Sequence, residues 1–400
     1  MFVRYNPFIL FGVMACGFFV SLVATEQSYY PVNSSILPIY VIDMIFCLFF
    51  LLMLVSSNHN KLSIRHKKLK KDIFAATRTL RAKVLICVLL SLLLLFNWQA
   101  IFASFVLNEK KEIFLTYVDY GYTYHIITPI LLFLSASRIS FGSGAPIIVV
   151  LAFFFFVASL QNKSLFLLII YFCYLFWWLD QLGKEKKQVG NWRFVVIAVC
   201  MISLATFTVL LQERRGAFVE ALLYSIEAFF RFKVIGFYLS DELFTIERGF
   251  QGAATALFGV VAEKISLLFS GGYGLLTDGF IARRIEIGPD NSQNAIYPWS
   301  VWLYAQMGVF GLVLKYIFLS SLFWIFLVTR FNASLLYLML IIIFESLFRH
   351  PFMNVTDLYF FIAFLLLDIY LLLLGQSRRV RQGKIRINRK PAAVSPQFRQ

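Results

Sequence analysis

Charged residues are scarce in this 400-residue chain, in which Asp, Glu, Lys and Arg together make up only 14%. Soluble domains carry roughly 25%, so a water-soluble globular protein is excluded. Apolar residues take the place of the missing charge: 60% of the chain is hydrophobic, and the mean hydropathy is +0.77. The sequence therefore predicts an integral membrane protein.

Acidic residues are the scarcer sign, with 21 Asp and Glu against 37 Lys and Arg, for a net charge of +16. A basic chain can bind nucleic acid, but here much of the excess lies in short blocks that flank apolar runs. That placement is typical of membrane proteins, whose cytoplasmic loops are rich in Lys and Arg. We therefore expect membrane lipids as partners and no nucleic acid.

Several chemical signatures are missing. All five cysteines (Cys16, Cys47, Cys87, Cys173 and Cys200) fall inside apolar runs, which does not suggest disulfides or a metal site. The chain has no D-x-D sequence, no His/Cys ligand spacing and no Walker A sequence, so neither a metal–nucleotide site nor an ATPase is indicated. We expect no metal and no cofactor.

Long apolar runs dominate the chain. Most have the 18–24 residues that cross a ~30 Å hydrocarbon core as a helix. We predict a single polytopic all-α membrane domain over residues 1–400. Its ten spans are 7–24, 36–55, 84–107, 121–137, 145–160, 165–182, 194–211, 298–328, 332–348 and 355–374. The first is interpreted as a retained helix rather than a signal peptide, because only Arg4 precedes it and many spans follow.

The distribution of basic residues predicts the orientation. A basic loop over 61–83, a shorter one over 184–193 and an acid-free tail over 377–400 fall on one predicted side. That side carries about twice as many Lys and Arg as the other, so both termini are expected in the cytoplasm. The tail is expected to be disordered.

Residues 212–297 break this pattern and are expected to form a large extracytoplasmic loop. Two semi-apolar segments within it, 217–239 and 252–269, are too charged for ordinary spans. They are expected to lie on the membrane surface or to face a polar cavity as amphipathic helices; if both cross, the spans number twelve. The loop also carries the arginines Arg214, Arg215, Arg231, Arg248, Arg283 and Arg284.

An arginine-rich surface suits an anionic ligand, because guanidinium groups bind phosphate bidentately and stay charged. Such a cluster could stabilise a pyrophosphate leaving group without a metal. The alternative is that these arginines pair with nearby acids or with lipid headgroups.

Two further ionisable residues are candidates. Lys315 lies inside an apolar run, where a charge is by default a functional candidate; the alternative is a side chain that snorkels to the interface. His350 follows Arg349 at a predicted outer boundary and could act as a general acid or base near neutral pH. The alternative is an ordinary interfacial histidine.

Two local patterns carry a resemblance to a known family. One is Gln212-Glu213-Arg214-Arg215-Gly216 just after a span. The other is a glycine-rich turn and a polar step leading into a helix with paired glycines: Gly271-Gly272-Tyr273-Gly274, Gln293-Asn294 and Gly308-Val309-Phe310-Gly311. In these the chain resembles the Wzy-type O-antigen polymerases and, more distantly, the O-antigen ligases. Many relatives have His-Asn at the polar step, where the ligases are expected to hold their acid/base group; this chain has Gln293.

The resemblance implies a GT-C-like glycosyltransferase of the bacterial inner membrane. Its substrate would be an oligosaccharide repeat unit linked to undecaprenyl pyrophosphate. The growing glycan would pass from that carrier to an incoming lipid-linked unit, outside the cytoplasm and without a cofactor. A flippase and a chain-length regulator would work beside it.

The resemblance also implies roles for residues. Arg215 with Arg283 and Arg284 would hold pyrophosphate oxygens, supplemented by Lys315. Gln293 and Asn294 would orient sugar or phosphate groups. His350, Glu247 or Asp290 would activate the acceptor hydroxyl. The substrate-binding set is completed by Arg214, Arg248 and Tyr273.

Three other interpretations stay open: an O-antigen ligase, a polysaccharide transporter or flippase, and an inert membrane scaffold. A transporter would also be helical with polar residues facing a cavity. However, the two halves of the sequence show no internal repeat, and one large outer loop suits a one-sided reaction better than alternating access.

Overall fold

The computed structural model describes residues 6–25, 35–78, 171–179, 234–270, 284–288, 291–294, 297–353 and 355–388, with isolated residues between 88 and 134 and between 219 and 230. These are called the described residues below.

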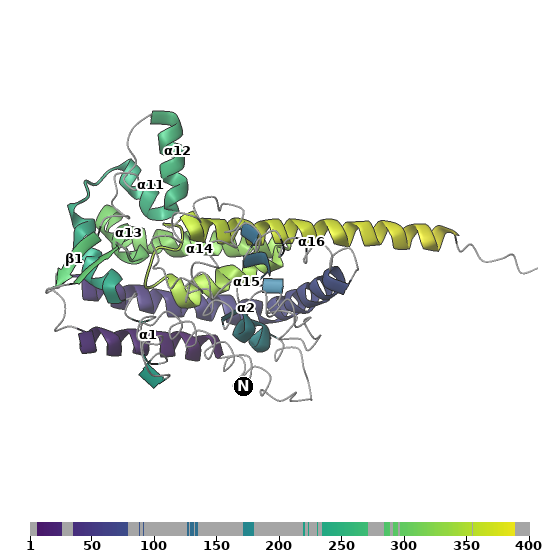
Figure 1. The fold of residues 1–400 in the computed structure, drawn as a ribbon, viewed down its shortest axis with the longest axis horizontal. Coiled ribbons are helices and arrows are strands. Elements are labelled where there is room, and N and C mark those ends of the chain that lie inside the picture. Colours follow the sequence, from purple (N-terminus) through teal and green to yellow (C-terminus); the bar gives the residue numbers. More distant parts are fainter. Residues whose placement is uncertain are drawn as a thin grey trace, which may run out of the picture.

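The described helices form a bundle that runs along one long axis (Figure 1). Its members are α1 (Asn6–Thr25), α2 (Ile36–Arg78), α14 (Val309–Thr329), α15 (Asn332–Leu340, continued by a π-helical turn over Ile341–Glu345) and α16 (Val355–Asn388). Helices α1, α2 and α14 are long and apolar enough to cross a membrane. The predicted helical, membrane-associated chain is thereby confirmed; the total of ten or twelve spans depends on segments outside the described residues and stays a prediction.

The bundle has two unlike ends (Figure 1). At the basic end lie residues 61–78 of α2, the end of α14 at Arg330, and the last turns of α16. Arg65 Nη2 donates to the carbonyl of Leu327 at 3.2 Å, which fixes the basic part of α2 beside the end of α14. At the hairpin end lie η3 (Leu239–Thr245), α11 (Phe250–Phe258), α13 (Trp299–Met307) and a β-hairpin.

Two helices are longer than expected. Helix α2 has 43 residues, or about 65 Å at about 1.5 Å per residue, so it continues through most of the predicted basic loop 61–83. That stretch of α2 has no Gly or Pro, and it buries Leu62, Leu69 and Ile73 against the bundle. Helix α16 reaches Asn388, so residues 377–388, expected to be disordered, are helical. Residues 389–400 lie outside the described residues.

One predicted span is broken by a glycine. The apolar run 298–328 divides at Gly308, which has φ +62° and ψ −150° and separates α13 from α14. Only glycine adopts such a conformation without strain. Three residues on, a Cβ at Gly311 would lie 2.4 Å from the carbonyl oxygen of Leu303. The paired glycines therefore turn the chain and then let α14 pack directly on the backbone of α13.

The same device divides α11 from α12 (Val260–Ser270). Gly259 has φ +58° and ψ −134°, and its N–H donates to the Thr255 carbonyl at 2.8 Å. A Cβ there would lie 2.1 Å from the carbonyl oxygen of Phe352, and the Val260 N–H donates to that same oxygen at 2.9 Å. The two broken helices pack together through α11 and α13.

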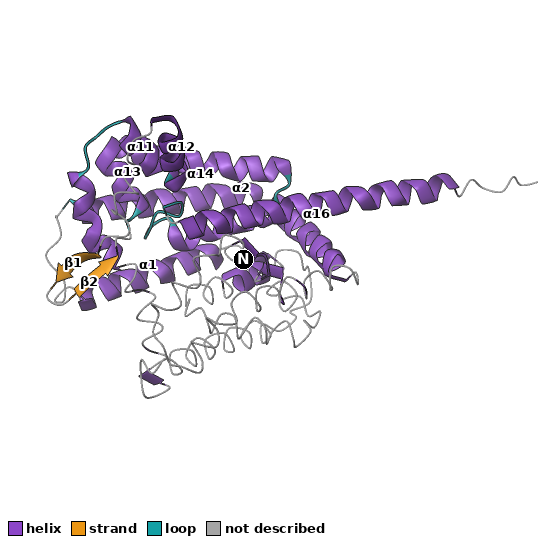
Figure 2. Ribbon diagram, turned by 45° about the horizontal axis from the view of Figure 1, so that its top comes forward, coloured by secondary structure: helices purple, strands orange, loops and turns teal. Residues whose placement is uncertain are grey.

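The hairpin joins β1 (Arg284–Gly288) to β2 (Asn291–Asn294) and lies at the hairpin end (Figure 2). The strands are antiparallel, with Arg284 opposite Asn294 and Ile285 opposite Gln293. The sequence analysis did not predict it. Its signal is the alternation of Ile285 and Ile287 followed by Gly-Pro-Asp-Asn, a turn sequence between two extended segments.

Helix α15 begins where α16 supplies its cap. Its first backbone N–H groups have no partner within the helix. The Asp368 carboxylate accepts the N–H groups of Ala333 at 2.9 Å and Ser334 at 2.8 Å, and also the Ser334 hydroxyl at 2.8 Å. This places a buried carboxylate at a helix N-terminus, where it is favoured.

The two ends of the bundle should lie on opposite faces of the membrane. In spheroplasts, a membrane-impermeant maleimide should label a cysteine at exposed Glu247 and a cysteine at exposed Lys71 from opposite sides, in a background where the native cysteines are replaced. If both sites reacted before permeabilisation, or both only after it, the two ends would lie on the same face of the membrane, which would contradict this prediction.

Glycine substitutions should distinguish the strain of a positive φ from the clash of an added Cβ with neighbouring backbone. We expect Gly259→Ala to lower the melting temperature of the detergent-solubilised protein most, because it meets both strain and a backbone clash. Gly308→Ala, with open space around the added Cβ, should cost about 1–3 kcal/mol from strain alone.

Gly12→Ala in α1 is the matched control, since nothing lies within 4 Å of its added Cβ. It should be neutral or slightly stabilising. Equal effects of all three substitutions would contradict the proposed role of the glycine breaks.

Candidate functional site

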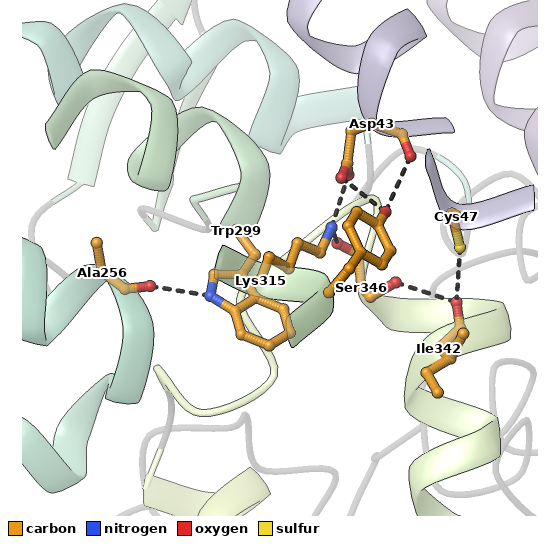
Figure 3. Close-up of polar contacts among 8 residues, drawn as sticks. Asp43, Cys47, Ala256, Trp299, Lys315, Ile342 and Ser346 are labelled. Carbon is orange, nitrogen blue, oxygen red and sulfur yellow. Dashed lines mark hydrogen bonds and ion pairs between the residues drawn. The ribbon is translucent and has the colours of Figure 1, made fainter. Parts of the chain in front are cut away.

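Lys315 lies at the centre of a buried polar cluster with Asp43, Ser346 and Trp299 (Figure 3). Tyr316 joins this cluster through its hydroxyl. Its ammonium Nζ is 2.6 Å from Oδ2 of Asp43, and both side chains are 0% exposed. It also donates to the backbone carbonyl of Ser346 at 2.7 Å. Helices α2 and α14 and the end of the α15 segment thus meet at one ion pair.

The local backbone makes the Ser346 carbonyl available. In the π-helical turn, the Ser346 N–H bonds to the Ile341 carbonyl at 2.8 Å, five residues back. A continuing helix would direct the N–H of His350 to Ser346, but that N–H donates to the Tyr297 carbonyl at 2.9 Å. The freed carbonyl accepts the lysine proton, which satisfies both groups.

The remaining atoms of the ion pair also have partners. The Tyr316 hydroxyl is 2.7 Å from Oδ1 of Asp43, and the Trp299 ring centroid lies 5.5 Å from Nζ of Lys315, within cation–π range. A buried charge pair is tolerated only when its remaining protons and lone pairs are also satisfied. The alternative that Lys315 snorkels to the interface is therefore wrong, and its ammonium is fully engaged within the protein.

His350 also packs against Trp299, with the two ring centroids 5.0 Å apart. Its Nε2 lies 2.9 Å from the carbonyl oxygen of Ala256, and its Nδ1 accepts the Phe352 N–H at 3.1 Å. Those partners assign the proton to Nε2 of a neutral ring. Burial lowers the pKa of His350 to about 3, and the positive charge of Lys315 adds to the lowering.

A general base needs an unshared nitrogen that reaches the substrate. His350 is 1% exposed, and both of its nitrogens are engaged. His350 thus ties the end of α11 to the loop before α16, and this arrangement does not support its expected role as the base that activates the acceptor hydroxyl.

Two candidate residues remain at the surface of the hairpin end. Arg248 is exposed, and its Nε donates to the Ala305 carbonyl at 3.0 Å, in the last turn of α13, where a cation is favoured by the helix dipole. Glu247 beside it is also exposed. A carboxylate and a guanidinium are thus presented together to the surroundings.

Three predicted residues come together in the hairpin. Arg284 and Asn294 are direct partners across the two strands, and Gln293 is adjacent to Asn294. The hairpin is built from one short stretch of the chain. The candidates Arg214, Arg215, Tyr273, Arg283 and Asp290 lie outside the described residues.

Sequence reasoning missed Asp43. It is the acid within the second apolar run, 36–55, and an intramembrane carboxylate calls for a partner by the same rule that singled out Lys315. Pairing the two unexplained charges would have predicted the contact of α2 with α14. No group of three or more His, Cys, Asp or Glu that could hold a metal occurs within the part of the chain that the structure describes.

The chain matches no model of a known protein family, no curated protein and no solved structure. The similarity to polysaccharide polymerases therefore depends on the local sequence patterns alone, and function is inferred from the arrangement of the residues.

Removing one member of the ion pair should destabilise the protein strongly. Asp43→Asn and Lys315→Met should each cost about 3–5 kcal/mol, because each leaves an uncompensated buried charge. The double variant, which has no charge at the site, should be more stable than either single variant. Melting temperatures in detergent measure this; additive losses in the double variant would show that the two residues do not interact.

His350 should make the protein sensitive to acid. As pH falls below the ordinary histidine pKa of about 6.5, the unfolded chain gains a proton that the native ring does not accept until about pH 3. Native stability should then decline as the pH falls through that range. His350→Gln, which keeps a donor and an acceptor, should show a shallower decline in melting temperature from pH 7 to pH 5. Identical pH profiles would contradict this role.

Proposed function

We propose that this protein is a membrane glycosyltransferase that polymerises a bacterial surface polysaccharide at the hairpin end of its bundle. The observation that carries the proposal is the hairpin, which pairs Arg284 with Asn294 at the end of the molecule opposite its basic helices. An arginine next to amides suits a phosphate-bearing sugar substrate.

The two unlike ends support an extracytoplasmic reaction. Lys- and Arg-rich segments of membrane proteins stay in the cytoplasm, so the basic end would face the cytoplasm of the bacterial inner membrane. The hairpin end would then face outward, where no ATP or sugar nucleotide is available. A lipid pyrophosphate is an activated glycosyl donor that needs neither.

The candidate residues would take different roles. Arg284, with Arg215 and Arg283, would bind the pyrophosphate oxygens of the undecaprenyl-linked glycan. Glu247 or Asp290 would accept the proton of the acceptor hydroxyl. Of these two, Glu247 belongs to the described residues, and it is exposed. Lys315 and His350, both buried and bonded, are assigned to the scaffold.

The reaction is a substitution at the anomeric carbon of the growing glycan. The acceptor oxygen, at the non-reducing end of the incoming lipid-linked unit, forms the new C–O bond. The bond from the anomeric carbon to the pyrophosphate oxygen breaks, and undecaprenyl pyrophosphate leaves with its electron pair. Arginines would stabilise the charge that develops on that leaving group. A flippase would supply the incoming unit.

Loss of Arg284 should shorten the glycan. In a deletion host, Arg284→Ala should reduce polymerisation on the order of 100-fold, because one charge-stabilising donor is removed, and the polysaccharide ladder should collapse toward a single repeat unit. Arg284→Lys should restore part of it. Lys71→Ala, an exposed basic residue at the other end, is the matched control and should give a normal ladder.

Expression is held equal in all strains. A normal ladder with Arg284→Ala would remove the hairpin from the site. Complete loss of polysaccharide from the lipid core in the deletion host would indicate a ligase or a flippase instead.

A further inference from the structure

Helix α12 exposes apolar side chains and buries its acidic side chain, Glu263. Among the α12 side chains that the structure describes, Val261, Lys264, Ile265 and Leu268 are exposed, and they are spaced as one helical face. Leu268 is 82% exposed and Ile265 50%, whereas Glu263 is only 3% exposed. A helix in water buries its apolar face and exposes its charge. The exposed face of α12 therefore suits apolar surroundings better than water.

The direction of α12 agrees with this. In Figure 1 it leaves the bundle and stands across the long axis, and Figure 2 again shows it at the edge of the bundle beside α11. The positive φ of Gly259 and the bond from the Val260 N–H to the Phe352 carbonyl hold that exit. With 11 residues, or about 16 Å, α12 is too short to cross a membrane.

The depth at which α12 begins is set by the end of α11, which packs on α14. Phe258, just before the break, lies 5.4 Å from Phe318 between ring centroids, so α12 leaves beside the third turn of α14 and not beyond its end. In the same half of α14, Phe310, Val313 and Ile317 are exposed. The half of α14 beside which α12 leaves the bundle therefore also exposes apolar side chains.

We infer that α12 is an interfacial helix that lies in the membrane leaflet on the hairpin side, with bilayer lipid as the partner of its exposed face. Val261, Ile265 and Leu268 contact acyl chains about 5–10 Å below the headgroup boundary. Lys264 lies on the same face and extends its ammonium to the lipid phosphates, since its long stem is apolar. This inference does not depend on the proposed reaction.

Spin labels on α12 test this surface. Nitroxides are attached to single cysteines at Leu268 and Ile265 in the full-length protein, with the native cysteines replaced. The protein is reconstituted in bilayers of phosphatidylethanolamine and phosphatidylglycerol. Collision with oxygen, which concentrates in lipid, is compared with collision with a water-soluble nickel chelate. A label at Ile317 on α14 is the lipid control, and a label at exposed Glu247 is the water control.

We expect both α12 labels to favour oxygen, as Ile317 does, and the Glu247 label to favour nickel. All four side chains are exposed, so the labels leave the packed interior intact. Nickel accessibility at α12 equal to that of Glu247 would overturn the inference, because the face would then be in water. Shielding from both reagents would also overturn it, because another protein surface would then cover α12.

Discussion

A buried ion pair constrains the centre of this molecule. Two charges can leave water only if they pair closely and their remaining donors and acceptors are satisfied. Lys315 and Asp43 meet this condition because Tyr316 bonds the carboxylate and the Ser346 carbonyl accepts the ammonium. That carbonyl is available because a π-helical turn ends the α15 segment there. Helices α2, α14 and α15 are therefore held in one mutual arrangement.

The ion pair and the rings of Trp299 and His350 are buried, and they differ in this from the exposed candidate residues at the hairpin end. Trp299 connects the ion pair to His350, and His350 connects α11 to the loop before α16. The hairpin end differs from this interior: it holds exposed Glu247 and Arg248, and the strand pair that contains Arg284 and Asn294. The two glycine breaks, Gly259 and Gly308, give this end its short helices and set the exit of α12.

Composition and run length predicted the membrane class and the bounds of α1, the start of α2 and the start of α15 well, because apolar length is a local property. The sequence also identified Gly308 and Gly311 as special, though only the structure shows that one turns the chain and the other admits the backbone of α13. Lys315 and His350 were noticed for their chemistry, but their engagement depends on Asp43 and Ala256, far away in the sequence, which no local pattern reveals. The helical continuation of α2 depends likewise on partners for Leu62 and Leu69.

The claim that the ion pair holds the bundle and takes no part in the proposed reaction is tested most directly by the uncharged double variant Asp43→Asn/Lys315→Met. It is expressed in a host that lacks the chromosomal gene. The measurement is the length distribution of the surface polysaccharide on a gel, at matched protein levels in the membrane. The account predicts a ladder like that of the wild-type protein, because the ion pair holds the bundle and takes no part in the reaction. A stable variant that leaves only single repeat units would contradict it and would return Lys315 to the site.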